Sequence, residues 1–443
     1  MNVFQIAFRS IRQRLVPSTL TGLSVALGVM LMVAVLVTYS VVNNAFQQRS
    51  IDYDLVVGKQ GGEYQLVLST IYRLETPPAP IPYRYYQVLK NRPSLFYKDV
   101  PAPEAAVPLV MGDTTQEGNF PIVGTTHEYF TNNYAPERAF KLKGSEFTDS
   151  FDAIIGSQVA ETNGWDIGST FQILHGGVNA HIHEEKFTVV GVLQRTGTAN
   201  DRTAFVQLSG FYSIADHNDT SLVEAKRREQ EFFGNDYDRI VAASEEFPDT
   251  DVSGSAIPTA RKAVTAILVK YPRKMLTVPS TLSGIMKKGH RAQAVNPNAV
   301  MRQLMSLIVG NVAMAIVVMT VLVIIVSGIG IFVSIYNSMS DRRREIGIMR
   351  ALGAQRQTVF SIIMAESILL CFGGGLIGVL FGHGLVFLGA PIVEAKTGLA
   401  VDPLTFHTAE FYLLPALLVL ASLVGFVPAL TAYRTDVSRA LVE

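Results

Sequence analysis

Four long apolar stretches divide the chain, at residues 17–42, 302–337, 358–389 and 411–433. Each is long enough for a helix that crosses a bilayer, which needs about 20 mostly apolar residues. The second stretch is the longest, and at ~1.5 Å per residue it exceeds the ~30 Å hydrocarbon core. The pattern predicts four transmembrane helices, of which the second tilts or extends beyond the bilayer as a stalk.

A shorter amphipathic pattern precedes the first stretch, over residues 1–16. Apolar residues recur there at helical spacing with three arginines beside them; they are Phe4, Phe8, Ile11 and Leu15. The pattern favours a helix that lies in the cytoplasmic interface, although a plain extension of the first transmembrane helix also fits. The apolar stretch that follows exceeds the core of a signal peptide, which has about 7–15 residues, so we expect an uncleaved anchor.

Positive charge sets the expected topology. The loop at 338–357 carries five arginines against two acidic residues and lies between two predicted spans. Short loops of this kind stay in the cytoplasm. Both termini, including the tail 434–443, are then cytoplasmic, whereas residues 43–301 and the short loop 390–410 lie outside. The region 43–301 is long enough for one large or two small domains.

The external region mixes strand-like and helix-like segments without strict alternation, which favours an α+β fold over a doubly wound sheet. Strands are expected at 51–57, ended by Gly58, and at 152–155, 171–174, 186–193 and 204–208. Helices are expected at 83–90, 221–233 and 256–269, with a short one after Gly156. The proline-rich stretch 76–82 is expected to be extended. The pairing of the strands does not follow from the sequence.

Composition narrows the function classes. Hydrophobic residues make up 49% of the chain and charged residues 17%, and the mean hydropathy is +0.28, as in a membrane protein. The net charge is zero, so nucleic acid is not an expected partner. The single cysteine, Cys371, excludes a disulfide within the chain. No G-x-x-x-x-G-K-[ST] loop occurs, so we expect a non-catalytic chain that binds no nucleotide by a P-loop.

Histidines gather near the end of one predicted strand, at His175, His181 and His183, with Glu184 beside them. These residue types bind metals. However, a glycine-rich turn between strands is where exposed polar residues are expected in any case, and nothing in the sequence supplies second-shell partners. The sequence therefore favours the absence of a metal site.

The third apolar stretch carries small residues four apart, at Gly374, Gly378 and Gly382. This spacing places them on one helix face that a neighbouring helix can approach closely. A movable helix contact and ordinary membrane packing both fit. Glu366 lies in the same stretch, near its cytoplasmic end. We expect this carboxylate to pair with a loop arginine, in preference to a role in proton relay.

The basic loop is also patterned as a short helix, because apolar residues recur within it and Gly353 is a typical helix stop. Two interpretations fit equally well: a helix that presses on a partner at the inner membrane face, or a solvated loop whose arginines only set topology. The residues concerned are Arg344, Glu345, Ile346, Gly347, Met349, Arg350, Ala351, Leu352, Gly353 and Ala354.

These motifs resemble those of a known family. The segment Arg344-Glu-Ile-Gly-Ile-Met-Arg-Ala-Leu-Gly-Ala354, the glycines within 373–382 and the ending Phe426-Val-Pro-Ala-Leu-Thr-Ala-Tyr-Arg434 resemble the carboxy-terminal core of FtsX-like permeases. The external stretches Ala153-Ile-Ile-Gly-Ser157 and Val189-Val-Gly-Val192 are similar to the periplasmic core domain of MacB-type permeases.

The resemblance implies a mechanotransmission ABC permease of the bacterial inner membrane. Such chains form homodimers or heterodimers in the bilayer and recruit separate ATPase subunits. Those subunits bind the ATP, so no cofactor is expected in this chain. The segment 341–356 would receive the push of the ATPases. A periplasmic adaptor or a lipoprotein is a further expected partner.

Two functions follow from the resemblance. The first is the export or extraction of a lipid, lipoprotein, peptide or small molecule, which the size of the external region favours. The second is signalling, in which the external domain regulates an enzyme outside the cytoplasm without transport, as in the cell-division FtsX type. The sequence does not name the substrate.

Overall fold

The computed structural model describes residues 2–434, with gaps at 48–50, 176–180, 215–216, 218–219, 248–256, 290, 342, 398–405 and 407, and describes some further helix residues by their backbone alone. The predicted tail from 435 onward and much of the loop 390–410 lie outside the described residues. Contacts divide the chain into two compact units. Unit 1 comprises Met1–Asn44, Ser306–Val393 and Val401–Glu443, and unit 2 comprises Ala45–Met305 and Glu394–Ala400.

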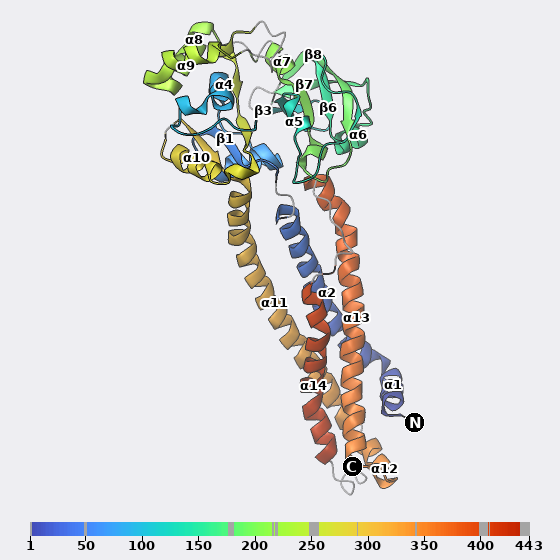
Figure 1. Ribbon diagram of the computed structural model, residues 1–443. Helices are drawn as coiled ribbons and strands as arrows, with labels where there is room; N and C mark the ends of the chain where they lie inside the picture. Colours follow the sequence, from blue (N-terminus) through green and yellow to red (C-terminus); the bar gives the residue numbers. More distant parts are fainter. Residues whose placement is uncertain are drawn as a thin grey trace. The chain divides into compact units, whose positions relative to one another are not determined.

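Helices make up unit 1, and most of them are long (Figure 1). The long ones are α2 Leu15–Gln47, α11 Pro297–Asp341, α13 Arg356–Thr397 and α14 Thr408–Arg434, and the short ones are α1 Val3–Gln13 and α12 Arg343–Ala351. The division between the units falls within α2, α11 and α13. In the described part of the chain, three segments are long and apolar enough to cross a membrane: Leu15–Val37, Arg356–Ile392 and Glu410–Arg434. The second predicted span, in the 45-residue α11, is not among them. The count of four spans therefore stays a prediction.

Helix α1 has the predicted amphipathic character. Phe4 and Phe8 are exposed, whereas Ala7 and Ser10 on the other face are buried. The backbone leaves helical geometry at Arg14, with φ −120° and ψ 54°, before α2 begins at Leu15. Helix α1 is therefore a separate helix and not a plain extension of α2.

One mixed sheet forms the centre of unit 2, with ten strands among the described residues. Nine strands run in the order β12-β1-β11-β3-β4-β9-β6-β8-β5, and β7 pairs with β3 and β8. Pairing is antiparallel except between β4 and β9 and between β6 and β8. The strand bounds are β1 Leu55–Lys59, β3 Ala105–Thr115, β4 Pro121–Thr125, β5 Leu142–Gly144, β6 Asp152–Ile155, β7 Thr170–His175, β8 His181–Leu193, β9 Ala204–Gln207, β11 Ala266–Lys270 and β12 Ala292–Val295; β2 Ile81–Pro82 pairs separately with β10 Ala263–Val264.

Both faces of this sheet are buried, because its central strands are apolar at successive positions. Side chains of a strand point alternately to opposite faces. Accordingly Ala153 and Ile155 of β6 belong to one hydrophobic cluster, while Ile154 between them belongs to another. The same alternation holds in β9, where Phe205 lies in the second cluster and Val206 in the first.

Short helices cover the sheet of unit 2, and α4, α8 and α9 lie together near one end (Figure 1). The helices are α3 Glu63–Val67, α4 Tyr83–Asn91, α5 Glu128–Thr131, α6 Ser157–Asn163, α7 Leu208–Ser213, α8 Leu222–Phe233, α9 Tyr237–Glu245 and α10 Val278–Lys287. Helix α8 begins where its sequence predicts, because the hydroxyl of Ser221 accepts a hydrogen bond from the backbone N–H of Glu224 at 3.2 Å.

Two local predictions for unit 2 are wrong. Residues 256–269 do not form one helix, because in the described part Ala263–Val264 and Ala266–Lys270 are strands. A continuous apolar run fits a buried strand as well as a helix, and pairing with β1 and β3 decided between them. Gly58 does not end the first strand. It pairs with Ala266 inside β1, where a Cβ would lie 2.5 Å from Leu66 Cδ1.

Candidate functional site

The predicted coupling segment is a helix with one buried face. Ile346 of α12 is 3% exposed and shares a hydrophobic cluster with residues of α13 and α14, whereas Ile348 and Leu352 are 44% and 83% exposed. The helix ends as the sequence predicts. Gly353 takes φ +102°, and the N–H of Ala354 donates to the carbonyl of Met349 at 3.0 Å, as in a Schellman stop. Arg342 and the side chains of Arg344 and Glu345 lie outside the described part.

The start of α13 is held next to α14. The guanidinium of Arg356 lies 5.9 Å from the ring centre of Tyr433, within the range of a cation–π contact. The sharp stop at Gly353 and this contact leave α12 only a short connection to the helix that follows.

The glycine row of α13 faces α2. A Cβ added to Gly374 would lie 2.6 Å from the carbonyl oxygen of Gly22, and one added to Gly378 would lie 2.6 Å from that of Ala26. Gly382 meets the same helix at a similarly short distance. Backbone-to-backbone approach of this kind is possible only for glycine, and it is how helices associate closely in lipid.

Glu366 is buried on α13, with 6% of its surface exposed. The hydroxyl of Ser10 in α1 donates a hydrogen bond to its Oε1 at 3.2 Å. The carboxylate thus contacts the amphipathic helix α1, a partner that the sequence did not suggest. The expected pairing with a loop arginine stays a prediction.

The predicted histidines of unit 2 lie in strands β7 and β8, whereas the sequence suggested a turn, and His183 is buried rather than exposed. Strand β8 begins at His181, and alternation along it places His183 on the buried face, where it is 3% exposed. His175 and His183 meet His217, which lies far along the chain, with one ring nitrogen of each within 4.8 Å of the others. Asp113 contacts two of the three rings. Glu184 is exposed and is not part of this group.

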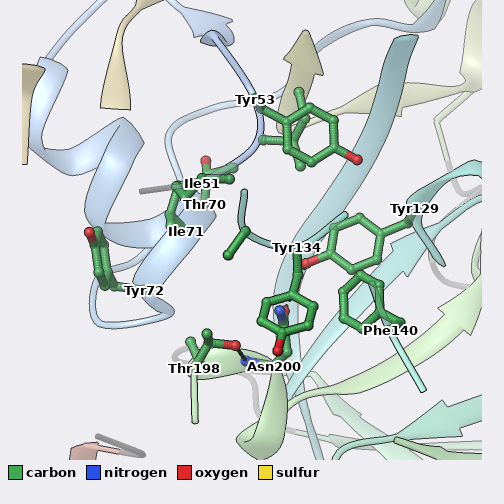
Figure 2. Close-up of a pocket in the computed structure, with 13 residues that line it drawn as sticks. Ile51, Tyr53, Thr70, Ile71, Tyr72, Tyr129, Tyr134, Phe140, Thr198 and Asn200 are labelled. Atoms are coloured by element: carbon green, nitrogen blue, oxygen red, sulfur yellow. Dashed lines mark hydrogen bonds between the residues drawn. The ribbon is translucent and has the colours of Figure 1, made fainter. Parts of the chain in front are cut away.

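An aromatic pocket of about 50 Å³ lies elsewhere in unit 2 (Figure 2). Phe140 lies 5.5 Å from Tyr129 and 5.1 Å from Tyr134, measured between ring centres. The Tyr129 hydroxyl donates to Asn200 Oδ1 at 2.7 Å. Burial raises the pKa of Tyr53, on the opposite wall, well above its ordinary value. Sites for drug-sized ligands occupy about 300–1,000 Å³, so this pocket as it stands holds only a small group.

A second pocket in unit 2 is larger, at about 340 Å³, and falls within the ligand range. Its lining is rich in charge, with four basic and two acidic side chains, and it also includes prolines and Phe232. The charged residues are Lys59, Arg228, Glu229, Glu231, Arg261 and Lys262. No local pattern in the sequence signals this pocket, because its walls come from separate segments between Lys59 and Ala263.

Two family models match the chain. The model described as MacB-like periplasmic core domain matches residues 18–246, and the model described as FtsX-like permease C-terminal matches residues 317–437. The first match extends from α2 into the sheet of unit 2, and the second includes α12, α13 and α14.

Curated relatives with the name macrolide export ATP-binding/permease protein MacB align with parts of the chain. The protein of Hyphomonas neptunium is 26% identical over 311 residues, which are 68% of this chain and 41% of the relative. That of Bdellovibrio bacteriovorus is 26% identical over 217 residues, or 49% of this chain and 29% of the relative. That of Syntrophobacter fumaroxidans is 37% identical over 79 residues, or 18% of this chain and 11% of the relative. The chain spans less than half the length of these relatives.

Proposed function

This chain belongs to the family of ABC transporter permeases with FtsX-like and MacB-like domains, and we propose that it couples ATP hydrolysis by a separate ATPase subunit to movement of unit 2. The matched regions are permease domains. In this proposal unit 2 lies in the periplasm of a bacterial cell, and both termini lie in the cytoplasm. Two permease chains, identical or different, assemble in the inner membrane.

The observation that carries the proposal is the two-sided character of α12. Its buried residue Ile346 belongs to the hydrophobic cluster of unit 1, whereas Ile348 and Leu352 present apolar surface. These two residues are four apart and so lie on one helix face. An apolar face on a short basic helix is a typical docking surface for a groove on a partner, with the apolar residues as anchors.

Movement would reach unit 2 through the helices that join the two units. Helix α11 is continuous from Pro297 in unit 2 to Asp341, and a single position separates its end from the start of α12 at Arg343. A continuous helix transmits displacement along its axis. The glycine contacts between α13 and α2 would bring α2, which also runs from unit 1 into unit 2, into the same motion.

The larger pocket of unit 2 favours transport over regulation of an enzyme as the proposed activity. A pocket of about 340 Å³ with mixed charge suits a polar or zwitterionic molecule, a peptide segment or a lipid headgroup. Export or extraction of such a cargo, with a periplasmic adaptor or lipoprotein as partner, is the specific function proposed. Regulation of an external enzyme without transport is the alternative, and it predicts no cargo in this pocket.

Replacing Ile348 of α12 and Leu352, the residue directly after this helix, by aspartate tests the docking step. The Ile348→Asp, Leu352→Asp chain should insert normally, because neither residue contributes to the buried cluster. When the tagged chain is captured from its own membranes, ATPase activity in the eluate should fall at least ten-fold. Glu345→Ala with Arg350→Ala should act in the same direction. Leu276→Asp is the matched control, since Leu276 is 80% exposed in unit 2.

Two results decide the test. Loss of ATPase activity in the α12 variants with retention in the Leu276→Asp chain supports docking through α12. Equal ATPase activity in wild type and in both α12 variants would show that the ATPase does not dock on this helix.

A further inference from the structure

Four side chains from distant parts of the chain meet at one edge of unit 2. Strands β3 and β7 pair with Thr114 opposite Leu174, and the next position of this antiparallel register sets Asp113 opposite His175. Strands β7 and β8 pair with His175 opposite His181, and His183 follows two residues along β8. The fourth side chain, His217, comes shortly after α7 and packs on Phe211, with ring centres 4.3 Å apart.

The three imidazoles that form a possible ligand set are compactly arranged. One ring nitrogen from each of His175, His183 and His217 lies within 4.8 Å of those of the other two. A tetrahedral zinc site has Zn–N bonds of about 2.0–2.1 Å, which places its ligand atoms about 3.4 Å apart. Side-chain movements of about 1 Å would therefore bring the three nitrogens to the spacing at which they can bind one ion. Surface histidines that merely share an exposed turn have no reason to converge in this way.

Asp113 supplies the negative charge that a cation site needs. Its side chain is 4% exposed, its Oδ1 lies 2.8 Å from His175 Nδ1, and its Oδ2 lies 3.3 Å from His217 Nε2. A carboxylate that holds a histidine ring is the common second-shell arrangement of metal sites, where it orients the ring and raises its basicity. The buried carboxylate thus holds the ring of His175 by its Nδ1, and it lies next to Nε2 of His217.

The tautomer of His217 gives an independent reason to expect a cation. Its Nδ1 lies 2.9 Å from the carbonyl oxygen of Phe211, and a carbonyl has no proton, so Nδ1 must be the donor. In a neutral ring Nε2 then carries a lone pair, and this buried nitrogen takes part in no hydrogen bond of the described residues, although Asp113 Oδ2 lies 3.3 Å away. A buried ring nitrogen without a hydrogen-bond partner, beside a carboxylate, is placed to bind a cation.

We propose that His175, His183 and His217 bind a divalent transition-metal cation of the zinc class, with Asp113 as the carboxylate that orients His175 and balances the charge. Imidazole nitrogen is a preferred ligand for Zn²⁺, Cu²⁺ and Ni²⁺, and not for Mg²⁺ or Ca²⁺. Three protein ligands leave the fourth position for water or for a ligand atom of another molecule.

The position of the site indicates that the ion exchanges with solvent. The side chain of His175 is 46% exposed, and the exposed His181 lies next to it, with ring centres 5.5 Å apart. A bound ion would cross-link β3, β7, β8 and the segment after α7. Metal loading would therefore stiffen this edge of unit 2, independently of any docking at α12.

Metal binding by the full chain tests the proposal directly. The chain is purified in detergent with an affinity tag that contains no histidine, stripped with a chelator, and titrated with Zn²⁺ in competition with a chromophoric chelator. The wild-type chain should bind one Zn²⁺ and should compete with the chromophoric chelator for it. His175→Ala and His217→Gln should each bind at least 100-fold more weakly. Asp113→Asn should lose about 10–100-fold, the usual effect of a second-shell carboxylate.

His127→Ala is the matched control, because His127 lies in the same unit in an ion pair with Glu146 at 2.7 Å and outside the cluster. Its affinity should equal that of wild type. Substitution of Co²⁺ for Zn²⁺ should give the intense visible absorption of a four-coordinate site in wild type and in His127→Ala, and should not give it in His175→Ala.

The outcomes separate a metal site from a protonated histidine cluster. Wild-type chains that bind no stoichiometric Zn²⁺, or that bind it as weakly as the His175→Ala chain, would overturn the proposal and assign the contact between His217 and Asp113 to a proton. Fluorescence of Trp165 in the same unit reports whether each variant is folded. If a substitution at a buried position unfolds the unit, the Zn²⁺ affinity of His175→Ala alone tests the proposal. This half-exposed side chain can be truncated without opening the core.

Discussion

Unit 2 packs around large side chains, whereas unit 1 packs around small ones. The bulkiest fully buried side chains of the described part all belong to unit 2, among them Tyr85, Phe205 and Phe233. The buried cluster of unit 1 is dominated by valine and alanine, including Val29 and Ala429. In unit 1 the large apolar side chains point outward instead.

The difference follows from the surroundings that each unit is built for. In water, burial of apolar area stabilises the folded state by about 25 cal/mol per Å², so large buried side chains stabilise a core most. In lipid there is no such drive between helices, because the hydrocarbon tails are as apolar as leucine. Close backbone contact then supplies the packing, and it needs small residues such as Gly378.

Two single residues make the comparison measurable. The only tryptophan of the chain, Trp165, stacks on Phe171 in unit 2, with ring centres 5.1 Å apart. The only cysteine, Cys371, is 1% exposed within the cluster of unit 1. Trp165 fluorescence therefore reports opening of unit 2, and reaction of the Cys371 thiol reports opening of unit 1.

The largest expected effect is an all-or-none difference in access from the two sides of the membrane. Single cysteines are placed at Val223 of unit 2 and Leu352 of unit 1, which are 80% and 83% exposed, in a Cys371→Ser chain. An impermeant thiol reagent added to spheroplasts should label the cysteine at 223 and leave that at 352 unlabelled, because the basic segment around α12 stays inside. After lysis both should react. Labelling at 352 in intact spheroplasts would reject the topology.

Next in size is the loss of a large ring from unit 2. Phe205 is fully buried and packs on Tyr129 and Phe130, with ring centres 5.1 and 5.3 Å away. Phe205→Ala should lower the free energy of unfolding of unit 2 by about 3–5 kcal/mol. Denaturant titration followed by Trp165 fluorescence measures this loss, and the reactivity of Cys371 should not change.

Leu276→Ala is the control for that prediction, because Leu276 is exposed and its truncation should change stability by less than about 0.5 kcal/mol. An equal shift of the Cys371 and Trp165 transitions in Phe205→Ala would mean that the two units unfold as one, and the comparison between them would lose its basis.

Features carried by local pattern were predictable from the sequence. The apolar stretches gave the long helices of unit 1, the Gly353 stop follows from its position after α12, and α4, α8 and β6 appear where their residues predict. Each of these depends on neighbours within about two turns of helix or one strand. The family motifs lie in the same segments and lead to the family that the comparisons show.

Features that depend on distant pairing were not predictable. Strand β3 was missed because its run Ala105–Thr115 includes Pro108 and Gly112. The apolar run at Ala266–Lys270 predicts a helix by itself, but in the structure it is a strand because it pairs with β1 and β3. The histidine cluster shows the same limit, since His175 meets Asp113 only through the pairing of β7 with β3, and His217 joins them from beyond α7. No spacing along the chain signals that meeting.

The smallest expected effect is also the sharpest test of packing by small residues. In Gly378→Ala the new Cβ would lie 2.6 Å from the carbonyl oxygen of Ala26 and 2.7 Å from Val29 Cβ. Backbone cannot move aside as a flexible side chain does, so α13 and α2 must separate slightly, at a cost of about 1–3 kcal/mol. In a detergent titration followed by thiol labelling, Cys371 should become reactive at a lower detergent concentration, whereas the Trp165 transition should stay in place.

Gly384→Ala is the matched control on the same helix, because a Cβ there meets nothing within 4 Å. Helix propensity alone favours alanine over glycine by about 1 kcal/mol, so Gly384→Ala should be neutral or stabilising. If the two variants shift Cys371 reactivity equally, the glycine row does not hold α13 against α2, and unit 1 must derive its packing from the valines around it.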